Sequence, residues 1–121
     1  MRKRDFDELV RQAVEDLPQD FLAIMENVDV QVRRWPMRRQ VRNADLERGD
    51  TLLGLYEGVP LTERGDSNMV LPDVITVFQA PIEDVCSSKE EIVSQVRATV
   101  VHEVAHYFGI TDEELEDWGV A

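Results

Sequence analysis

The chain has 121 residues, 43% of them hydrophobic, and a formal net charge of −12 at pH 7. This length and apolar content are typical of one globular domain with a true core, so we expect a single domain over residues 1–121. The acidic balance argues against a nucleic-acid or membrane-surface partner, because phosphate binding needs a basic face.

The sequence also indicates a compartment. Its basic start turns acidic at Asp5 without the apolar core of a secretory signal, and no apolar run approaches the roughly 20 residues that span a bilayer. The single cysteine, Cys86, cannot form an internal disulfide. We therefore predict a cytoplasmic protein in which Cys86 is a bystander thiol.

Apolar spacing predicts the first elements of the chain. Side chains from Phe6 to Leu17 recur at three- and four-residue steps, which is typical of an amphipathic helix over residues 5–16. A short second helix follows over residues 21–25 and closes near Asn27. The period then changes to two, and the alternation of Val28, Val30 and Val32 with polar residues predicts a strand.

The middle of the chain reads as two strands between polar loops. Residues 33–50 are polar, rich in arginine and interrupted by proline, which predicts a long exposed loop. We expect a strand over residues 51–56, a polar loop over 62–68 and a β-branched strand over 73–78 that ends before Pro81.

The last third of the chain is predicted to be helical. Ser88 and Glu91 have the spacing of a capping box, and an apolar stripe continues from there to Gly109, a residue suited to ending a helix. Thr111 and Glu114 repeat the capping-box spacing and open a short terminal helix.

The basic residues are unevenly distributed. Residues 1–42 hold nine of the 13 basic residues beside eight acids, so the remainder carries four bases and 17 acids. The run Arg33-Arg34-Trp35-Pro36-Met37-Arg38-Arg39 could attract nucleic acid or an acidic partner. In so acidic a chain, we expect instead a solvated loop whose arginines pair with the acidic C-terminal half.

The two histidines of the chain carry its clearest chemical signal. His102 and His106 lie four residues apart on the expected long helix, with Glu103 beside the first. Residues i and i+4 share one face of a helix, so both imidazoles can converge on one cation. Zinc suits this ligand set, and Glu103 is then placed to act on a metal-activated water. The alternatives are a metal that binds without catalysis and two polar residues on an ordinary helix.

A catalytic zinc site usually needs a third protein ligand. Gly109 lets the chain reverse, and Asp112 follows His106 by six residues, a spacing that some zinc peptidases use for their three ligands. We predict Asp112 as the third ligand, with Glu113 and Glu116 as alternatives. An acid in the first turn of a helix also interacts favourably with the helix dipole, so Asp112 can serve both roles.

The same residues suggest how a peptide would be hydrolysed. Glu103 would take a proton from the activated water, which attacks a carbonyl, and would later deliver that proton to the leaving amine. Tyr56 and Tyr107 are candidates for stabilising the oxyanion, although packing is the more natural role for Tyr107. A peptide substrate can lie along an exposed sheet edge.

Five segments together resemble one known family. They are Leu17-Pro18, Glu26-Asn27-Val28, Leu53-Gly54-Leu55-Tyr56-Glu57-Gly58, Leu71-Pro72-Asp73 and the run from His102 to Asp112. On these residues, the chain from about Leu17 to Leu115 resembles the small bacterial zincin-like family of possible zinc metallopeptidases. Position 107 is often another histidine in such sequences and here is Tyr107.

The resemblance implies a fold and a set of roles. The fold would be an α+β minimal zincin-like domain with two N-terminal helices, a mainly three-stranded sheet, a long C-terminal metal-binding helix and a short terminal helix. His102 and His106 would bind zinc, Asp112 would be the third ligand, and Glu103 would be the catalytic acid/base. We thus expect an enzyme, a zinc metallopeptidase acting on a peptide or protein. The alternative is a non-catalytic metal-binding or protein-interaction module.

Overall fold

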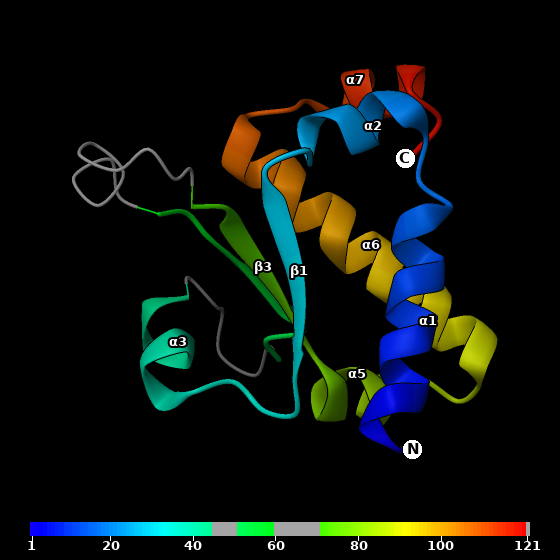
Figure 1. Ribbon diagram of the computed structural model, residues 1–121, viewed down its shortest axis with the longest axis vertical. Helices are drawn as coiled ribbons and strands as arrows, with labels where there is room; N and C mark the ends of the chain where they lie inside the picture. Colours follow the sequence, from blue (N-terminus) through cyan, green and yellow to red (C-terminus); the bar gives the residue numbers. More distant parts are fainter. Residues whose placement is uncertain (45–50, 60–70, 121) are drawn as a thin grey trace.

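The computed structural model describes residues 1–44, 51–59 and 71–120 (Figure 1). These residues form six helices and three strands, and the predicted α+β class is confirmed. In chain order the elements are α1 (Lys3–Glu15), α2 (Gln19–Ile24), β1 (Val28–Arg33), α3 (Arg38–Asn43), β2 (Gly54–Glu57), β3 (Asp73–Phe78), α5 (Gln79–Val85), α6 (Lys89–Phe108) and α7 (Asp112–Asp117).

The three strands form a mixed sheet in the order β1-β3-β2. Strand β1 runs parallel to β3, from the pair Val28–Asp73 to the pair Arg33–Phe78. Strand β2 runs antiparallel to β3 and forms one edge of the described sheet. The central strand is rich in β-branched residues, which suit a pleated surface covered by other elements, and Ile75 and Val77 are fully buried.

The core lies between the sheet and the two longest helices. Helix α6 packs against α1, β2 and β3, and Figure 1 shows α1 and α6 together on one side of the sheet. Fully buried side chains come from α1 (Phe6), α2 (Phe21), β3 (Val77) and α6 (Val100, Val104). Ile82 of α5 and Leu115 of α7, at the two ends of α6, join the same apolar cluster, and Tyr56 of β2 packs against it.

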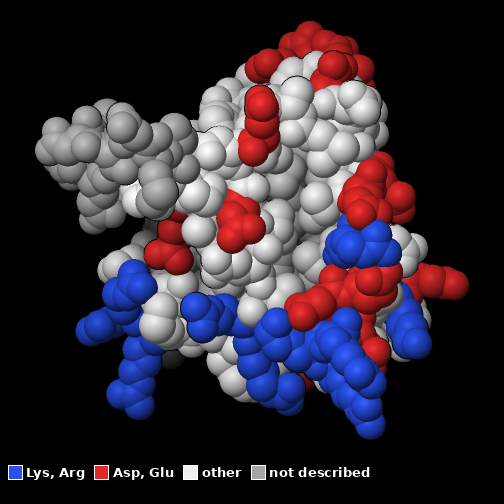
Figure 2. Space-filling model, viewed as in Figure 1, with Lys and Arg blue, Asp and Glu red and all other residues white. Residues whose placement is uncertain are grey.

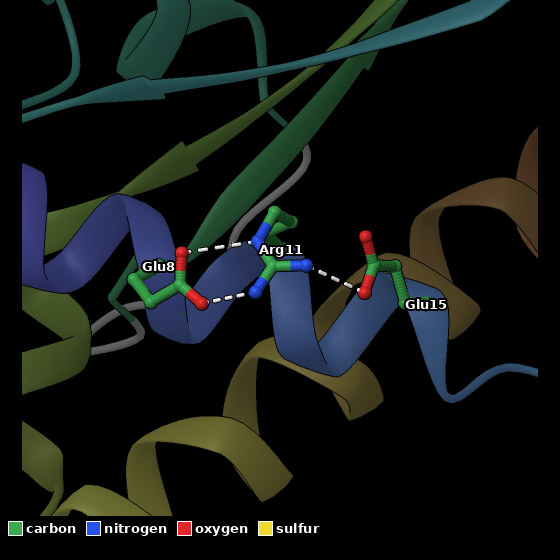
Figure 3. A network of polar contacts seen from close by, with 3 residues as sticks. All are labelled: Glu8, Arg11 and Glu15. Carbon is green, nitrogen blue, oxygen red and sulfur yellow. Dashed lines mark hydrogen bonds and ion pairs between the residues drawn. The ribbon is translucent and has the colours of Figure 1, made fainter.

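The outer face of α1 carries a charged network (Figure 3). Arg11 hydrogen-bonds to Glu8 and, at 2.6 Å, to Glu15. The bond from Arg11 lowers the pKa of Glu8, and both carboxylates raise the pKa of Arg11. Because these groups are exposed, water and salt screen the interaction and it adds little to stability.

Helix α6 has 20 residues and is about 30 Å long. The Ser88 hydroxyl accepts a hydrogen bond from the Glu91 N–H at its start, and Gly109 adopts the left-handed conformation at its end, as predicted. In the described ranges, no helix is both long enough and apolar enough to cross a membrane. The cytoplasmic location stays a prediction.

Two helices were not expected from the sequence. The predicted exposed loop over residues 33–50 contains α3, and its part at 45–50 lies outside the described residues. Strand β3 ends before Pro81 as expected, but the chain continues directly into α5, where Pro81 is the third residue. A proline is tolerated in the first turn because the N–H it lacks would have no partner there. The predicted loop over 62–68 also lies outside the described residues.

Candidate functional site

The His-Glu-x-x-His run occupies the C-terminal part of α6. Val101, Val104 and Ala105 face the core, so the other side of this turn faces outward. His102 and His106 are exposed there, one turn apart. The apolar stripe that buries one side of α6 therefore presents both imidazoles on the opposite side.

Both histidines line one hollow at the surface. Its volume is about 680 Å³. Its other lining residues come from α6, from β2 and the segment just before it, and from the end of α3 and its C-cap: Asn43, Ala44, Leu52, Leu55, Tyr56, Glu103 and Tyr107. A second hollow of about 410 Å³ shares Leu52, His102 and Glu103 with the first and extends toward Gln95. Together they form a cleft along α6 beside β2, with His102 and Glu103 at its centre.

Strand β2 turns part of its backbone toward this cleft. The Phe78 N–H donates to the Leu53 carbonyl at 2.9 Å. Pairs in an antiparallel ladder alternate between bonded and non-bonded positions, so the register makes Tyr56 and Ile75 a non-bonded pair. The N–H and C=O of Tyr56 consequently point away from β3, toward the edge of the described sheet.

Glu103 accepts a hydrogen bond from that edge. Its Oε1 lies 3.3 Å from the backbone nitrogen of Tyr56. The side chain is half-buried, whereas His102 and His106 are exposed. The carboxylate thus contacts the strand edge from the same turn of α6 that carries both histidines.

An aromatic cluster forms part of the cleft wall. The rings of Tyr56 and Tyr107 stack with centroids 4.0 Å apart, and Phe108 meets both edge-on. The Tyr56 hydroxyl donates to the buried carboxylate of Asp73 at 2.7 Å. Gly58 leaves room for the Tyr107 hydroxyl, since a Cβ at Gly58 would stand 2.5 Å from it. Packing thus explains the position of the Tyr107 ring, as expected, and the Tyr56 hydroxyl is hydrogen-bonded to Asp73.

The sequence did not predict the role of Gln40, which connects α3 to β2 beside the site. Its amide donates to Glu57 at 2.9 Å, and its carbonyl oxygen accepts the Met37 N–H at 2.8 Å. Arg39 adds an ion pair to Glu57 at 3.5 Å. Because Gln40 is buried in a polar, arginine-rich run, local hydropathy carried no signal for this contact.

The predicted third ligand lies just beyond α6. Asp112 is the first residue of α7, exposed, directly after the N-cap Thr111. Glu113 and Glu116 are also exposed on α7. Within the described ranges, no three His, Cys, Asp or Glu side chains lie together as a metal site would require. The choice of Asp112 over its alternatives therefore stays a prediction.

Cys86 lies far along the chain from this cleft, just before α6 begins. Burial raises the pKa of its thiol, and the nearby carboxylate of Glu91 raises it further. Such a thiol is a poor nucleophile and a poor metal ligand. This agrees with the expectation of a bystander cysteine.

Comparison with known proteins agrees with this geometry. The sequence profile of the zincin-like metallopeptidases matches residues 25–120, which include β1 and all of α6. Because the match covers most of the chain, the protein belongs to the zincin-like metallopeptidase family.

A solved structure has the same fold. It is a conserved hypothetical protein from T. thermophilus, which superposes with a TM-score of 0.55 at 22% identity over 89% of this chain and 94% of that chain. At this identity the likeness concerns the fold alone. No curated protein matches the chain.

Proposed function

We propose that this protein is a zinc-dependent metallopeptidase that hydrolyses a peptide bond. His102 and His106 would hold the metal, and Glu103 would be the general base. The observation that carries the proposal is the position of Glu103, which lies in a cleft with both histidines and contacts the edge of β2 through the Tyr56 N–H.

The donors in the cleft suit zinc. Two imidazoles one helical turn apart, exposed on the same cleft, are a common part of zinc sites, and Asp112 is the predicted third donor. When bound, zinc would supply a Lewis acid that polarises a carbonyl and activates water.

The side chains of the protein would supply the proton transfers. The Glu103 carboxylate would accept a proton from the attacking water and then deliver it to the leaving amine. The contact with the Tyr56 N–H limits the positions that this carboxylate can adopt. Positioning of this kind matters, because a general base acts only within hydrogen-bond reach of its proton.

The edge of β2 would hold the peptide substrate. Strand β2 forms one edge of the described sheet, and an extended peptide can add to such an edge as a further strand. A peptide placed there would lie along the cleft beside α6, next to Glu103 and His102.

The test combines metal content with hydrolysis of a quenched fluorescent casein by the zinc-loaded protein. Glu103→Gln should retain zinc and lose activity by about 100-fold or more, because general-base catalysis contributes on that order. Glu90→Gln, a change of the same kind at the far end of α6, should retain both. Full activity in Glu103→Gln would contradict the assignment of the base. Zinc binding with no hydrolysis of any peptide by the wild type would favour a non-catalytic metal-binding or interaction module.

A further inference from the structure

Helix α3 and the turn before it carry an exposed surface that the proposed chemistry does not use. Gln40 faces inward, while Asn43 and Ala44 border the cleft. We call six of the other side chains the arginine face: Trp35, Pro36, Met37, Arg38, Val41 and Arg42. Four of them, two arginines with a proline and a valine, line a hollow of about 600 Å³.

The arginine face exposes apolar side chains beside its charges. Trp35 is 63% exposed, Met37 53% and Val41 42%. An exposed tryptophan in an arginine-rich segment is a common composition of binding surfaces, in which aromatic and arginine residues contribute most of the affinity.

Few carboxylates of the protein itself neutralise this surface. Of the five arginines between positions 33 and 42, only Arg39 forms an ion pair with a described residue, Glu57. In the described part of the chain, the expected pairing with the acidic C-terminal half is limited to the attraction between Arg34 and Glu83, which helps to lower the pKa of that carboxyl. Figure 2 shows Lys and Arg gathered at the lower end of the molecule, and Figure 1 places the acidic helix α7 at the upper end.

We propose that the arginine face binds an acidic segment of the protein substrate, one that combines carboxylates with an apolar side chain. The proposal rests on the proposed peptidase function and adds a substrate class to it. Because α3 contributes both to this face and, through Asn43 and Ala44, to the cleft wall, a chain lying in the cleft can continue onto it.

The net charge favours a short acidic segment over a nucleic acid. Charges farther away than about 8 Å are largely screened at physiological salt, so a short segment responds mainly to the nearby arginines. A long polyanion would also come close to acidic surfaces of the protein, whose net charge is −12, and would be repelled by them. The apolar side chains of Met37 and Val41 suit a peptide side chain better than a phosphate backbone.

The test measures binding separately from hydrolysis. The probe is a short fluorescein-labelled peptide rich in glutamate with one leucine, and the matched peptide has glutamine at each glutamate. We expect fluorescence anisotropy to show binding of the acidic peptide alone, weakening as salt rises. Arg38→Ser/Arg42→Ser should weaken binding about fivefold or more.

The control removes the same charge elsewhere. Arg2→Ser/Arg4→Ser, at the start of α1, should change affinity by less than about twofold. Circular dichroism and thermal unfolding verify that both variants are folded. Equal losses in the two variants, absence of binding, or tighter binding of an oligonucleotide of equal charge would each overturn the proposal.

Activity gives a second readout that separates the two proposals. With a cleavable peptide carrying an acidic extension, Arg38→Ser/Arg42→Ser should raise KM and leave kcat unchanged, because this face contacts no reacting atom. Peptide binding without hydrolysis would contradict only the peptidase proposal. Hydrolysis that ignores the acidic extension would contradict only the docking proposal.

Discussion

Gly54 of β2 and Thr99 of α6 lie so close together that no side chain fits between the two elements at position 54. A Cβ at Gly54 would stand 2.5 Å from Thr99 Cγ2 and 3.1 Å from the Thr76 carbonyl oxygen. Helix α6 carries the histidines, and β2 carries the strand edge. The missing side chain at Gly54 therefore helps to set the width of the cleft between them.

Gly54→Ala is expected to destabilise the protein by about 1 to 3 kcal/mol, the usual cost of overpacking a core. It should also displace α6 from β2 and lower peptidase activity. Urea denaturation and the hydrolysis assay measure the two effects.

Thr99→Ser supplies the matched control for Gly54→Ala. It removes Cγ2 and keeps the hydroxyl that bonds to Gln95. The double variant should recover part of the lost stability and activity, with the Thr76 carbonyl limiting the recovery. No recovery at all would show that this contact does not set the spacing.

The buried carboxylate of Asp73 gives a second prediction. Tyr56→Phe removes a donor 2.7 Å from this carboxylate and keeps the ring that stacks on Tyr107. Loss of a hydrogen bond to a charged group should cost about 1.5 to 3 kcal/mol. The Val59 N–H still donates to Asp73, which favours the lower part of this range.

Tyr107→Phe is the control for Tyr56→Phe, because it also removes one hydroxyl and preserves the stacked pair. The free energy of unfolding from urea titration should fall less in this variant. Equal losses in both variants would mean that the bond between Tyr56 and Asp73 is not an important stabilising contact.

The third metal ligand can be identified by isothermal titration with zinc. Metal binding usually weakens by roughly 10–100-fold when a metal ligand keeps its place but loses its hydrogen-bond partner. If Asp112 coordinates the metal directly, Asp112→Ala should weaken zinc binding by more than this. Glu113→Ala and Glu116→Ala, on the same short helix, should change the affinity little. A large loss in either of these variants, with Asp112→Ala unaffected, would reassign the ligand.

The pH dependence of stability should report on Glu83. Burial tends to raise the pKa of this carboxyl, but hydrogen bonds from the Gln79 amide and the α-amino group of Met1, with the positive charges of that amino group and of Arg34, outweigh it and lower the pKa overall. The two donors lie 3.1 and 3.3 Å from Glu83 Oε1.

A carboxyl with a lowered pKa stabilises the fold above its unfolded pKa of about 4.3, and this stability is lost as pH falls through the folded pKa. Glu83→Gln should therefore reduce the free energy of unfolding near pH 7 and flatten its decline in acid. Asp84→Asn, an exposed neighbour, should leave the curve nearly unchanged. Urea titrations across the acid range compare the variants, and identical curves for wild type and Glu83→Gln would contradict the prediction.

Local signals predicted the longest helix well. Ser88 caps α6 and Gly109 ends it in the left-handed conformation, because capping and a positive φ depend on one or two residues. The same reasoning placed His102 and His106 on one face. The capping box of α7, between Thr111 and Glu114, also formed as predicted.

Local sequence signals failed to predict the elements whose position depends on contacts between residues far apart in the chain. Helix α3 is short and arginine-rich, and its docking depends on the contact between Gln40 and Glu57, 17 positions away. Pro81 was interpreted only as a strand terminator, although it also suits the first turn of α5. Strand β2 begins at Gly54, three residues later than predicted, at the close approach to Thr99.

The sequence by itself determined the α+β class, the two ends of α6 and the position of His102 and His106 on one helix face. Helical periodicity and capping act over a few neighbouring residues. The tertiary structure alone decided that Glu103 meets the backbone of Tyr56 and that α3 borders the cleft. Strand register and helix packing bring together residues that are 47 positions apart in the first contact, and no local pattern encodes such a separation.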